Sequence, residues 1–151
     1  MRLTIVAVGK ARRGAERALF DLYASRLSWG LAVREVEEKK PLSGDALKAR
    51  EAALIRAALP AGAAVVALDE RGRDLKSRAL AGRLGAWRDA GREVAFVIGG
   101  ADGLDPGLRA EADLVLALGR LTWPHLMVRA MLAEQIYRAE TILAGHPYHR
   151  D

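Results

Sequence analysis

Five short apolar runs alternate with longer segments of helical periodicity along this chain. The runs cover residues 2–8, 31–36, 63–68, 93–98 and 113–118, and each is rich in Val, Leu, Ile or Ala and bounded by Gly, Pro or charged residues. Such runs are typical of strands. Three of them are almost continuously apolar, as expected of strands that are covered on both faces.

The segments between the runs have the spacing of helices. Residues 14–27 carry apolar side chains on one face, namely Ala18, Leu19, Leu22 and Leu27. Residues 44–59 and 77–91 end at the stop signals Pro60 and Gly91. The alternation predicts an α/β fold in which an open, mostly parallel sheet has helices on both faces. The length fits a single domain over residues 1–151.

The composition narrows the class of protein. Hydrophobic residues make up 51% of the chain and charged residues 28%, which is ordinary for a globular protein and unlike a disordered one. There is no cysteine, so disulfides and thiolate metal sites are excluded. The apolar run at the N-terminus is too short for a signal peptide or a membrane span, and we therefore expect a cytoplasmic protein.

The formal net charge of +5 is carried mostly by arginine. Arginine suits phosphate and carboxylate groups, so a basic surface of this kind favours a polyanionic partner such as RNA, an acidic membrane or an acidic protein. A chain rich in arginine and alanine is also typical of a GC-rich genome, and charge alone leaves both interpretations open.

Three loops follow the third, fourth and fifth predicted strands, at residues 68–73, 98–107 and 118–125. Ligands of open parallel sheets bind outside the carboxyl ends of the strands. Gly99, Gly100 and Gly103 do not form the G-x-G-x-x-G dinucleotide fingerprint, which excludes a classical nicotinamide site, and no P-loop is present. These glycines suit a turn before Asp105 as helix cap and Pro106 as first helical residue, and they also let a ligand approach the backbone.

The last predicted helix, residues 126–143, is apolar almost all round. A helix with one buried face has a single apolar stripe, whereas this pattern predicts burial on two sides. We expect one side to cover the sheet and the other to form a homodimer, because a small domain has little room for a fully covered helix. The alternative is a central helix in a monomer.

Four motifs occur in order near the end of the chain: FVIGGADGL, LTWPH, EQIYRA and GHPYHRD. Together with VAVGK, YASRL and LDERGR nearer the start, they resemble the SPOUT-class RNA methyltransferases, in particular the RlmH family. The resemblance covers the whole chain. It implies an enzyme that uses S-adenosylmethionine to methylate N3 of a pseudouridine in 23S ribosomal RNA.

The resemblance also implies a fold and a cofactor site. The C-terminal part of the family's sheet fold forms a deep trefoil knot, and the cofactor lies among the late loops. Carried over by motif, the cofactor-binding residues are Leu68, Gly99, Gly100, Leu118, Gly119, Arg120, Leu121, Thr122, Trp123 and Pro124. Trp123 stands where the resemblance leads us to expect a smaller aliphatic residue.

The implied chemistry is methyl transfer from a sulfonium to a ring nitrogen, which requires no metal. Positioning can supply most of the catalysis, with a weak base or cation supplying the rest. The candidates are His125, Arg129, His146, Tyr148, His149 and Arg150. We expect the start of the last helix and the C-terminal tail to form the target-base pocket, with the tail as a lid over the methyl group.

Plainer roles stay open for several of these residues. His125 could cap the helix, and Arg129 could form an interface salt bridge. The H-x-x-H of the tail has no third ligand in view, so we expect no metal site. Lys10, Arg12 and Arg13 suit either a solvated loop or contacts to RNA phosphates.

The implied substrate is the assembled ribosome, recognised by a homodimer that carries no added RNA-binding module. Two other classes of function remain. One is a non-catalytic RNA- or ribosome-binding protein of the same fold, against which the retained small residues of the cofactor loops argue. The other is a flavodoxin-like or nucleotide-binding regulator, which rests on fold pattern alone.

Overall fold

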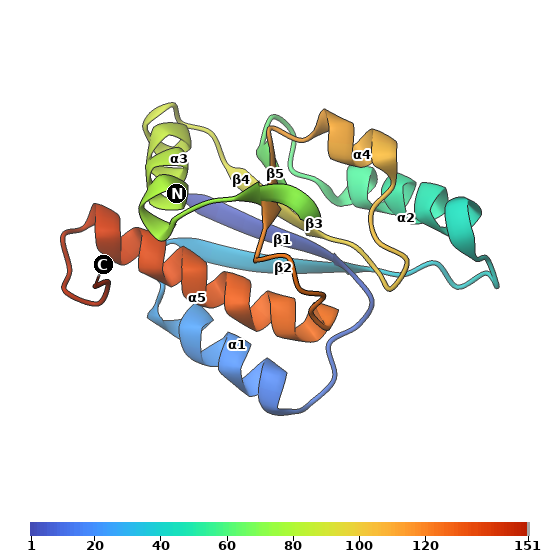
Figure 1. The fold of residues 1–151 in the computed structure, drawn as a ribbon, viewed down its shortest axis with the longest axis horizontal. Helices are drawn as coiled ribbons and strands as arrows, with labels where there is room; N and C mark the ends of the chain where they lie inside the picture. Colours follow the sequence, from blue (N-terminus) through green and yellow to red (C-terminus); the bar gives the residue numbers. More distant parts are fainter. Residues whose placement is uncertain (151) are drawn as a thin grey trace.

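The computed structural model describes residues 1–150, and within them a single parallel sheet forms the centre of the molecule (Figure 1). Its strands are β1 (Arg2–Val8), β2 (Gly30–Val36), β3 (Ala64–Asp74), β4 (Val94–Ile98) and β5 (Leu114–Ala117), in the order β2-β1-β4-β3-β5. Each pairing is parallel. The predicted α/β class and parallel sheet are therefore confirmed.

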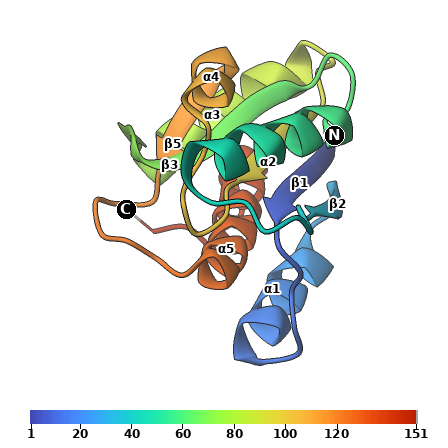
Figure 2. The same ribbon diagram turned by 90° about the vertical axis from the view of Figure 1, so that its right-hand side faces the viewer.

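Helices cover both faces of this sheet, as expected. Helices α3 (Ser77–Asp89) and α5 (His125–Leu143) lie over one face, with α1 (Ala15–Arg26) beside α5 on the same side. Helices α2 (Gly44–Ala58) and α4 (Pro106–Glu111) lie over the other face (Figures 1 and 2). On the first face Phe96 of β4 is fully buried in a cluster with Leu84 and Ile136. On the second face Val97 packs with Ile55 and Leu108.

Strand β3 is longer than the apolar pattern predicts. Residues 69–73, expected as part of a loop, continue the strand to Asp74, and after a register shift Arg73 and Asp74 pair with Leu116 and Ala117 of β5. Gly72 lies so close to β5 that a Cβ there would be 2.7 Å from the carbonyl carbon of Val115. The resemblance predicts the trefoil knot in this late part of the chain, and the knot stays a prediction.

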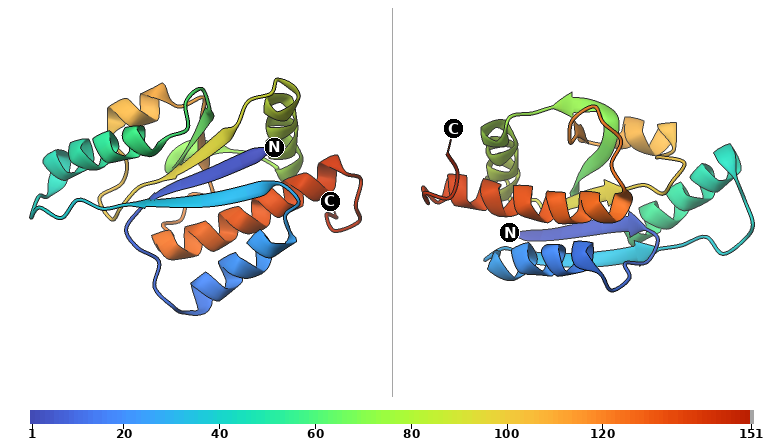
Figure 3. Two further views of the ribbon diagram at one scale, coloured as in Figure 1. Left: turned by 180° about the vertical axis from the view of Figure 1, so that it is seen from behind. Right: turned by 60° about the horizontal axis from the view of Figure 1, so that its bottom comes forward.

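The expectation for the first helix is wrong in part. Leu27 packs against the core, but Leu19 and Leu22 are exposed. Helix α1 lies beside α5 rather than flat on the sheet, because β2 is an edge strand that leaves little sheet for α1 to cover (Figure 3). The apolar stripe of α1 therefore extends beyond its buried contact.

Helix α5 is buried on two sides, as its pattern predicts. It begins at His125, one residue earlier than expected, and its buried residues include Leu132, Ala133 and Ile136. Helices α1 and α3 of the same chain flank it (Figure 1). Burial of α5 on two sides is thus achieved without a second copy, and the homodimer needs other support.

Candidate functional site

A cavity of about 680 Å³ opens at the carboxyl ends of β3, β4 and β5. Its walls come from the segments 68–71, 98–104 and 118–125, which are far apart in sequence. The volume lies within the range of small-molecule sites, and the position is where parallel sheets bind their ligands.

Glycines shape two of these walls. Gly103 and Gly119 have φ values of +83° and +88°, in the left-handed region that favours glycine. The Gly103 N–H donates to the Gly100 carbonyl at 3.0 Å, which closes the turn. The Asp105 side chain then accepts from the Leu108 N–H at 3.1 Å, with Pro106 at the first position of α4. The predicted cap is therefore confirmed.

Polar contacts tie the walls to one another. Arg109 Nη1 of α4 is 3.1 Å from Asp69 Oδ2, and Asp69 also accepts the Arg71 N–H at 2.8 Å. The Thr122 hydroxyl donates to Glu70 at 3.2 Å, which links the β5–α5 loop to β3. Asp69 and Glu70 thus link α4 and the β5–α5 loop to β3 and hold the cavity walls together.

A buried carboxyl lies behind the glycine turn. Glu51 of α2 is 6% exposed, and its Oε1 has no hydrogen-bond partner among the described residues. A Cβ on Gly100 would be 2.8 Å from Glu51 Oε2, so this position accepts only glycine without rearrangement. Burial, together with the nearby Asp102 carboxylate, raises the pKa of Glu51 above its ordinary value.

The structure brings most of the predicted cofactor residues to this one cavity. Its lining includes Leu68, Gly99, Gly100, Leu118, Gly119, Leu121, Thr122, Trp123 and Pro124. Arg120 does not line it. Trp123 is fixed by its indole N–H, which donates to the Leu118 carbonyl at 3.0 Å. Sequence reasoning missed Lys48 and Arg109 in the lining, because each lies in a helix that carries no motif.

The two candidate catalytic residues at the start of α5 lie in different cavities. His125 lines the large cavity, whereas Arg129 lines a second cavity. Arg129 is 4% exposed; its Nη1 donates to Glu35 at 2.6 Å and its Nη2 to the Gly9 carbonyl at 2.7 Å. Arg129 thereby fastens α5 to the carboxyl ends of β1 and β2. Its ion pair is made within the chain.

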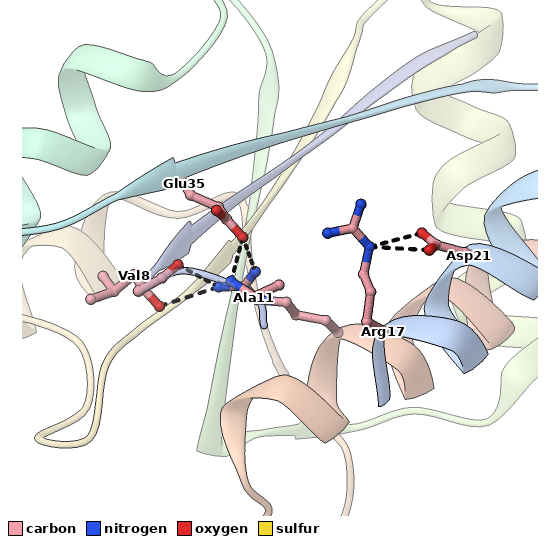
Figure 4. Close-up of polar contacts among 7 residues, drawn as sticks. Val8, Ala11, Arg17, Asp21 and Glu35 are labelled. Atoms are coloured by element: carbon pink, nitrogen blue, oxygen red, sulfur yellow. Dashed lines mark hydrogen bonds and ion pairs between the residues drawn. The ribbon is translucent and has the colours of Figure 1, made fainter. Parts of the chain in front are cut away.

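Glu35 is well stabilised as a carboxylate. Burial alone would raise its pKa, but the Ala11 N–H, donating at 2.7 Å, and the Arg129 guanidinium outweigh burial and hold the pKa below its ordinary value. Figure 4 shows Ala11 and Glu35 meeting at this junction of β1, β2 and α5.

The C-terminal tail lies at the other end of α5. Tyr148 donates its hydroxyl to Glu134 at 3.0 Å and packs edge-on against Tyr137, with ring centroids 4.8 Å apart. His149 Nδ1 is 3.2 Å from Arg138 Nη1, and His146 Nδ1 accepts the Tyr148 N–H at 3.1 Å. Burial and the hydrogen bonds to Tyr23 and Glu134 raise the pKa of Tyr148.

This arrangement differs from the expected lid. The tail residues Tyr148, His149 and Arg150 line neither cavity. From His125 to Tyr137 the helix rises about 18 Å, at 1.5 Å per residue. Figure 1 shows residues 146–150 beside the end of α5 that is remote from its start. Within one protomer, the tail therefore does not cover the large cavity.

Comparison with known proteins identifies the family. A family described as "Predicted SPOUT methyltransferase" matches residues 1–149. The chain belongs to the SPOUT methyltransferases. It is 60% identical over 151 residues to the ribosomal RNA large subunit methyltransferase H of Paramagnetospirillum magneticum, covering 99% of each chain. The protein of that name from Rhodospirillum centenum is also 60% identical, with the same coverage.

Solved structures support the fold. A probable methylase family protein from Haemophilus influenzae aligns with 99% of this chain and 70% of its own, with a TM-score of 0.60 and 12% identity. Family membership makes the protein a methyltransferase, and SPOUT methyltransferases use S-adenosylmethionine as methyl donor. Among residues 1–150, no helix is long and apolar enough to cross a membrane. The same residues contain no cluster of three or more potential metal ligands.

Proposed function

We propose that this SPOUT methyltransferase methylates N3 of a pseudouridine in 23S ribosomal RNA, on the assembled ribosome in the cytoplasm. The large-subunit rRNA methyltransferases to which it is 60% identical match it end to end, so the proposal transfers to the whole chain. The observation that carries it is the cavity in which the family's late loops meet at the carboxyl ends of β3, β4 and β5.

The residues present fit S-adenosylmethionine in this cavity. Gly99 and Gly100 leave the backbone open to close approach, and Leu118, Leu121 and Trp123 supply apolar surface for a flat base. The lining is mixed in charge, with the carboxylates Asp69, Glu70 and Asp102 and the cations Lys48, Arg71 and Arg109, and Asp69 is paired with Arg109. When bound, the cofactor supplies an activated methyl group, so no metal is needed.

This chain's residues then have to orient the target base and manage its N3 proton. His125 lines the cavity and is the imidazole nearest to it, so we assign it the position next to the acceptor base. The imide N–H between two carbonyls is a comparatively strong acid, and holding the base in line with the methyl group supplies much of the rate. Arg129 acts as a positioning residue, because its guanidinium fixes the first turns of α5.

A second copy of the chain would complete the pocket. The tail carries Tyr148, His149 and Arg150, the residues that we expect in a lid over the methyl group. In one copy of the chain, however, the tail lies at the far end of α5. Leu121 is 71% exposed beside the cavity mouth, and Trp123 and Met127 are exposed next to it. We propose that these apolar side chains join a homodimer in which each cavity receives the tail of the other copy.

Calorimetric titration with S-adenosylmethionine tests the cofactor assignment. We expect saturable binding to the full chain, followed by tritium transfer from labelled cofactor to ribosomes that lack this methylation. Absence of binding at millimolar cofactor would refute the proposed enzymatic function and favour a non-catalytic ribosome-binding protein. Binding without transfer to ribosomes would refute the substrate.

Mixed dimers test the tail. A chain ending at Gly145 keeps the cavity and lacks the tail, and Leu118→Trp enlarges a side chain of the cavity lining and keeps the tail. Each variant alone should fail to transfer methyl groups, and a mixture should regain activity. A mixture as inactive as its parts would contradict a tail supplied by the second copy.

A further inference from the structure

A second cavity, of about 280 Å³, lies on the other flank of the start of α5. Leu126 and Arg129 of α5 line it, while His125 and Val128 of the same turns line the large cavity. The width of one helix, about 10 Å, therefore separates the two cavities. The proposed target-base site and the second cavity are neighbours.

The second cavity combines an apolar wall with cations. Phe20 of α1, Val33 of β2 and Leu126 supply the wall. Positive charge comes from Arg12, Arg17 and Arg129, and negative charge from Glu16 and Glu35. Arg12 makes no hydrogen bond or ion pair with any of residues 1–150, so its guanidinium is available. The Nε of Arg17 is held by Asp21 at 3.0 and 3.1 Å, which leaves its outer nitrogens directed away from Asp21 (Figure 4).

The lining also contains an unsatisfied donor. Arg129 is 4% exposed and makes hydrogen bonds through Nη1 and Nη2, but its buried Nε has no partner among the described residues. A buried donor without a partner costs about 1–3 kcal/mol, so such groups call for an acceptor. Neither carboxylate of the lining, Glu16 or Glu35, is a partner of this Nε, and Glu35 is already engaged by Arg129 Nη1 and Ala11.

We propose that the second cavity binds one unstacked nucleotide of the ribosomal RNA, adjacent to the methylated one. The base packs against Phe20 and Val33, and its phosphate lies against Arg12 and Arg17. In sequence-specific RNA recognition, unstacked bases pack against aromatic side chains or guanidinium groups, and arginines contact the phosphates. The volume is below that of the cofactor cavity and suits a single nucleotide. This inference rests on the proposed function and names a further part of its substrate.

The test compares Arg12→Ala with Arg13→Ala, measured as affinity for ribosomes that lack the methylation. Both variants remove one positive charge from the same loop, but only Arg12 lines the cavity. Arg12→Ala should weaken binding on the order of 10-fold and reduce the slope of log affinity against log salt by about 0.7–0.9. Arg13→Ala should cost no more than about 3-fold. Equal losses would overturn the inference.

A filling variant provides an independent measurement. Val33→Trp places a bulky side chain in the cavity, and Leu19→Trp places the same side chain on an exposed position that lines neither cavity. We expect Val33→Trp to weaken ribosome binding on the order of 10-fold and Leu19→Trp to change it less than about 2-fold. Affinity for S-adenosylmethionine should be unchanged in both. Unaltered ribosome binding by a folded Val33→Trp protein would refute the inference.

The tail of a second copy is the competing occupant. In a background truncated after Gly145, the loss caused by Arg12→Ala should persist, since an RNA contact does not need the tail. Disappearance of that loss would assign the cavity to the tail and overturn the inference. The proposed function is judged separately, because it stands or falls with methyl transfer by the unaltered chain.

Discussion

Replacement of Gly72 by alanine tests how closely β3 is packed on β5. The added Cβ would lie 2.7 Å from the Val115 carbonyl carbon and 2.8 Å from both the nitrogen and the carbonyl carbon of Leu116. Carbon atoms in contact normally stay about 3.5–4.0 Å apart. The obstacle is backbone in a paired strand, so no side chain can rotate out of the way.

The magnitude follows from the displacement needed. Strand β5 would have to move by several tenths of an ångström, against the pairing of Arg73 and Asp74 with Leu116 and Ala117. Overpacking of a well-packed interior costs about 1–3 kcal/mol, and immobile backbone places this site at about 3 kcal/mol. For a domain of this length, that lowers the melting temperature by about 6–12 °C.

Gly82 offers a matched control. It lies in α3, is exposed, and has nothing within 4 Å of an added Cβ. Gly82→Ala should therefore stabilise the protein by about 0.5–1 kcal/mol through helix propensity. Urea unfolding followed by circular dichroism measures both variants, with unchanged m-values as the check on a common unfolding reaction. A Gly72→Ala protein within about 0.5 kcal/mol of the unaltered chain would refute the close crossing of β3 and β5.

Three further predictions concern the glutamates and the glycine turn. Gly100→Ala should weaken S-adenosylmethionine binding on the order of 10-fold in calorimetry, and Glu51→Ala should relieve part of that loss; additive effects would contradict the contact. The raised pKa of Glu51 means that the folded state binds its proton more tightly, so this residue's contribution to stability falls as pH rises above the unfolded value. Glu51→Gln should accordingly stabilise the protein on the order of 1 kcal/mol at pH 7 and have no such benefit at pH 4, as judged by urea unfolding at both values. The pH dependence of the contribution from Glu35 has the opposite sign. Its pKa is lowered, so its stabilisation is present above the unfolded pKa and is lost as pH falls. Glu35→Gln should therefore cost about 2 kcal/mol at pH 7, whereas the control Glu37→Gln should cost almost nothing.

The strands were largely predictable because each buried parallel strand leaves a continuous apolar run. The run at 93–98 corresponds to Val94–Ile98, whose residues are all buried. The extension of β3 through Arg73 and Asp74 was not predictable, because its charged residues pair only when β5 lies beside them. The predicted burial of Leu19 and Leu22 was wrong for a related reason. Periodicity identifies an apolar stripe on a helix but does not show how much of that stripe a neighbouring element covers.

The large cavity was partly predictable from its loops. Gly99, Gly100 and Pro124 mark places where the chain turns or lets a ligand approach, and each can be recognised in the sequence without knowledge of the fold. Lys48 and Arg109 join the same wall from helices on the other side of the sheet, and no local pattern marks them. The second cavity lacked any motif, because it depends on α1, β2 and α5 meeting in space.

The placement of the tail follows from the length of α5, which the sequence already contains. The helix runs for 19 residues, so the segments before and after it are about 28 Å apart. The loop 118–124 precedes it and the tail follows it, and an unbroken helix keeps them at opposite ends. Because the structure packs the tail against Glu134 and Tyr137 of its own α5, the two segments share one site only if a second copy supplies one of them. An obligate dimer would explain why so small a methyltransferase keeps cofactor loops and tail at the two ends of one rigid helix: each end of α5 would serve a different active site.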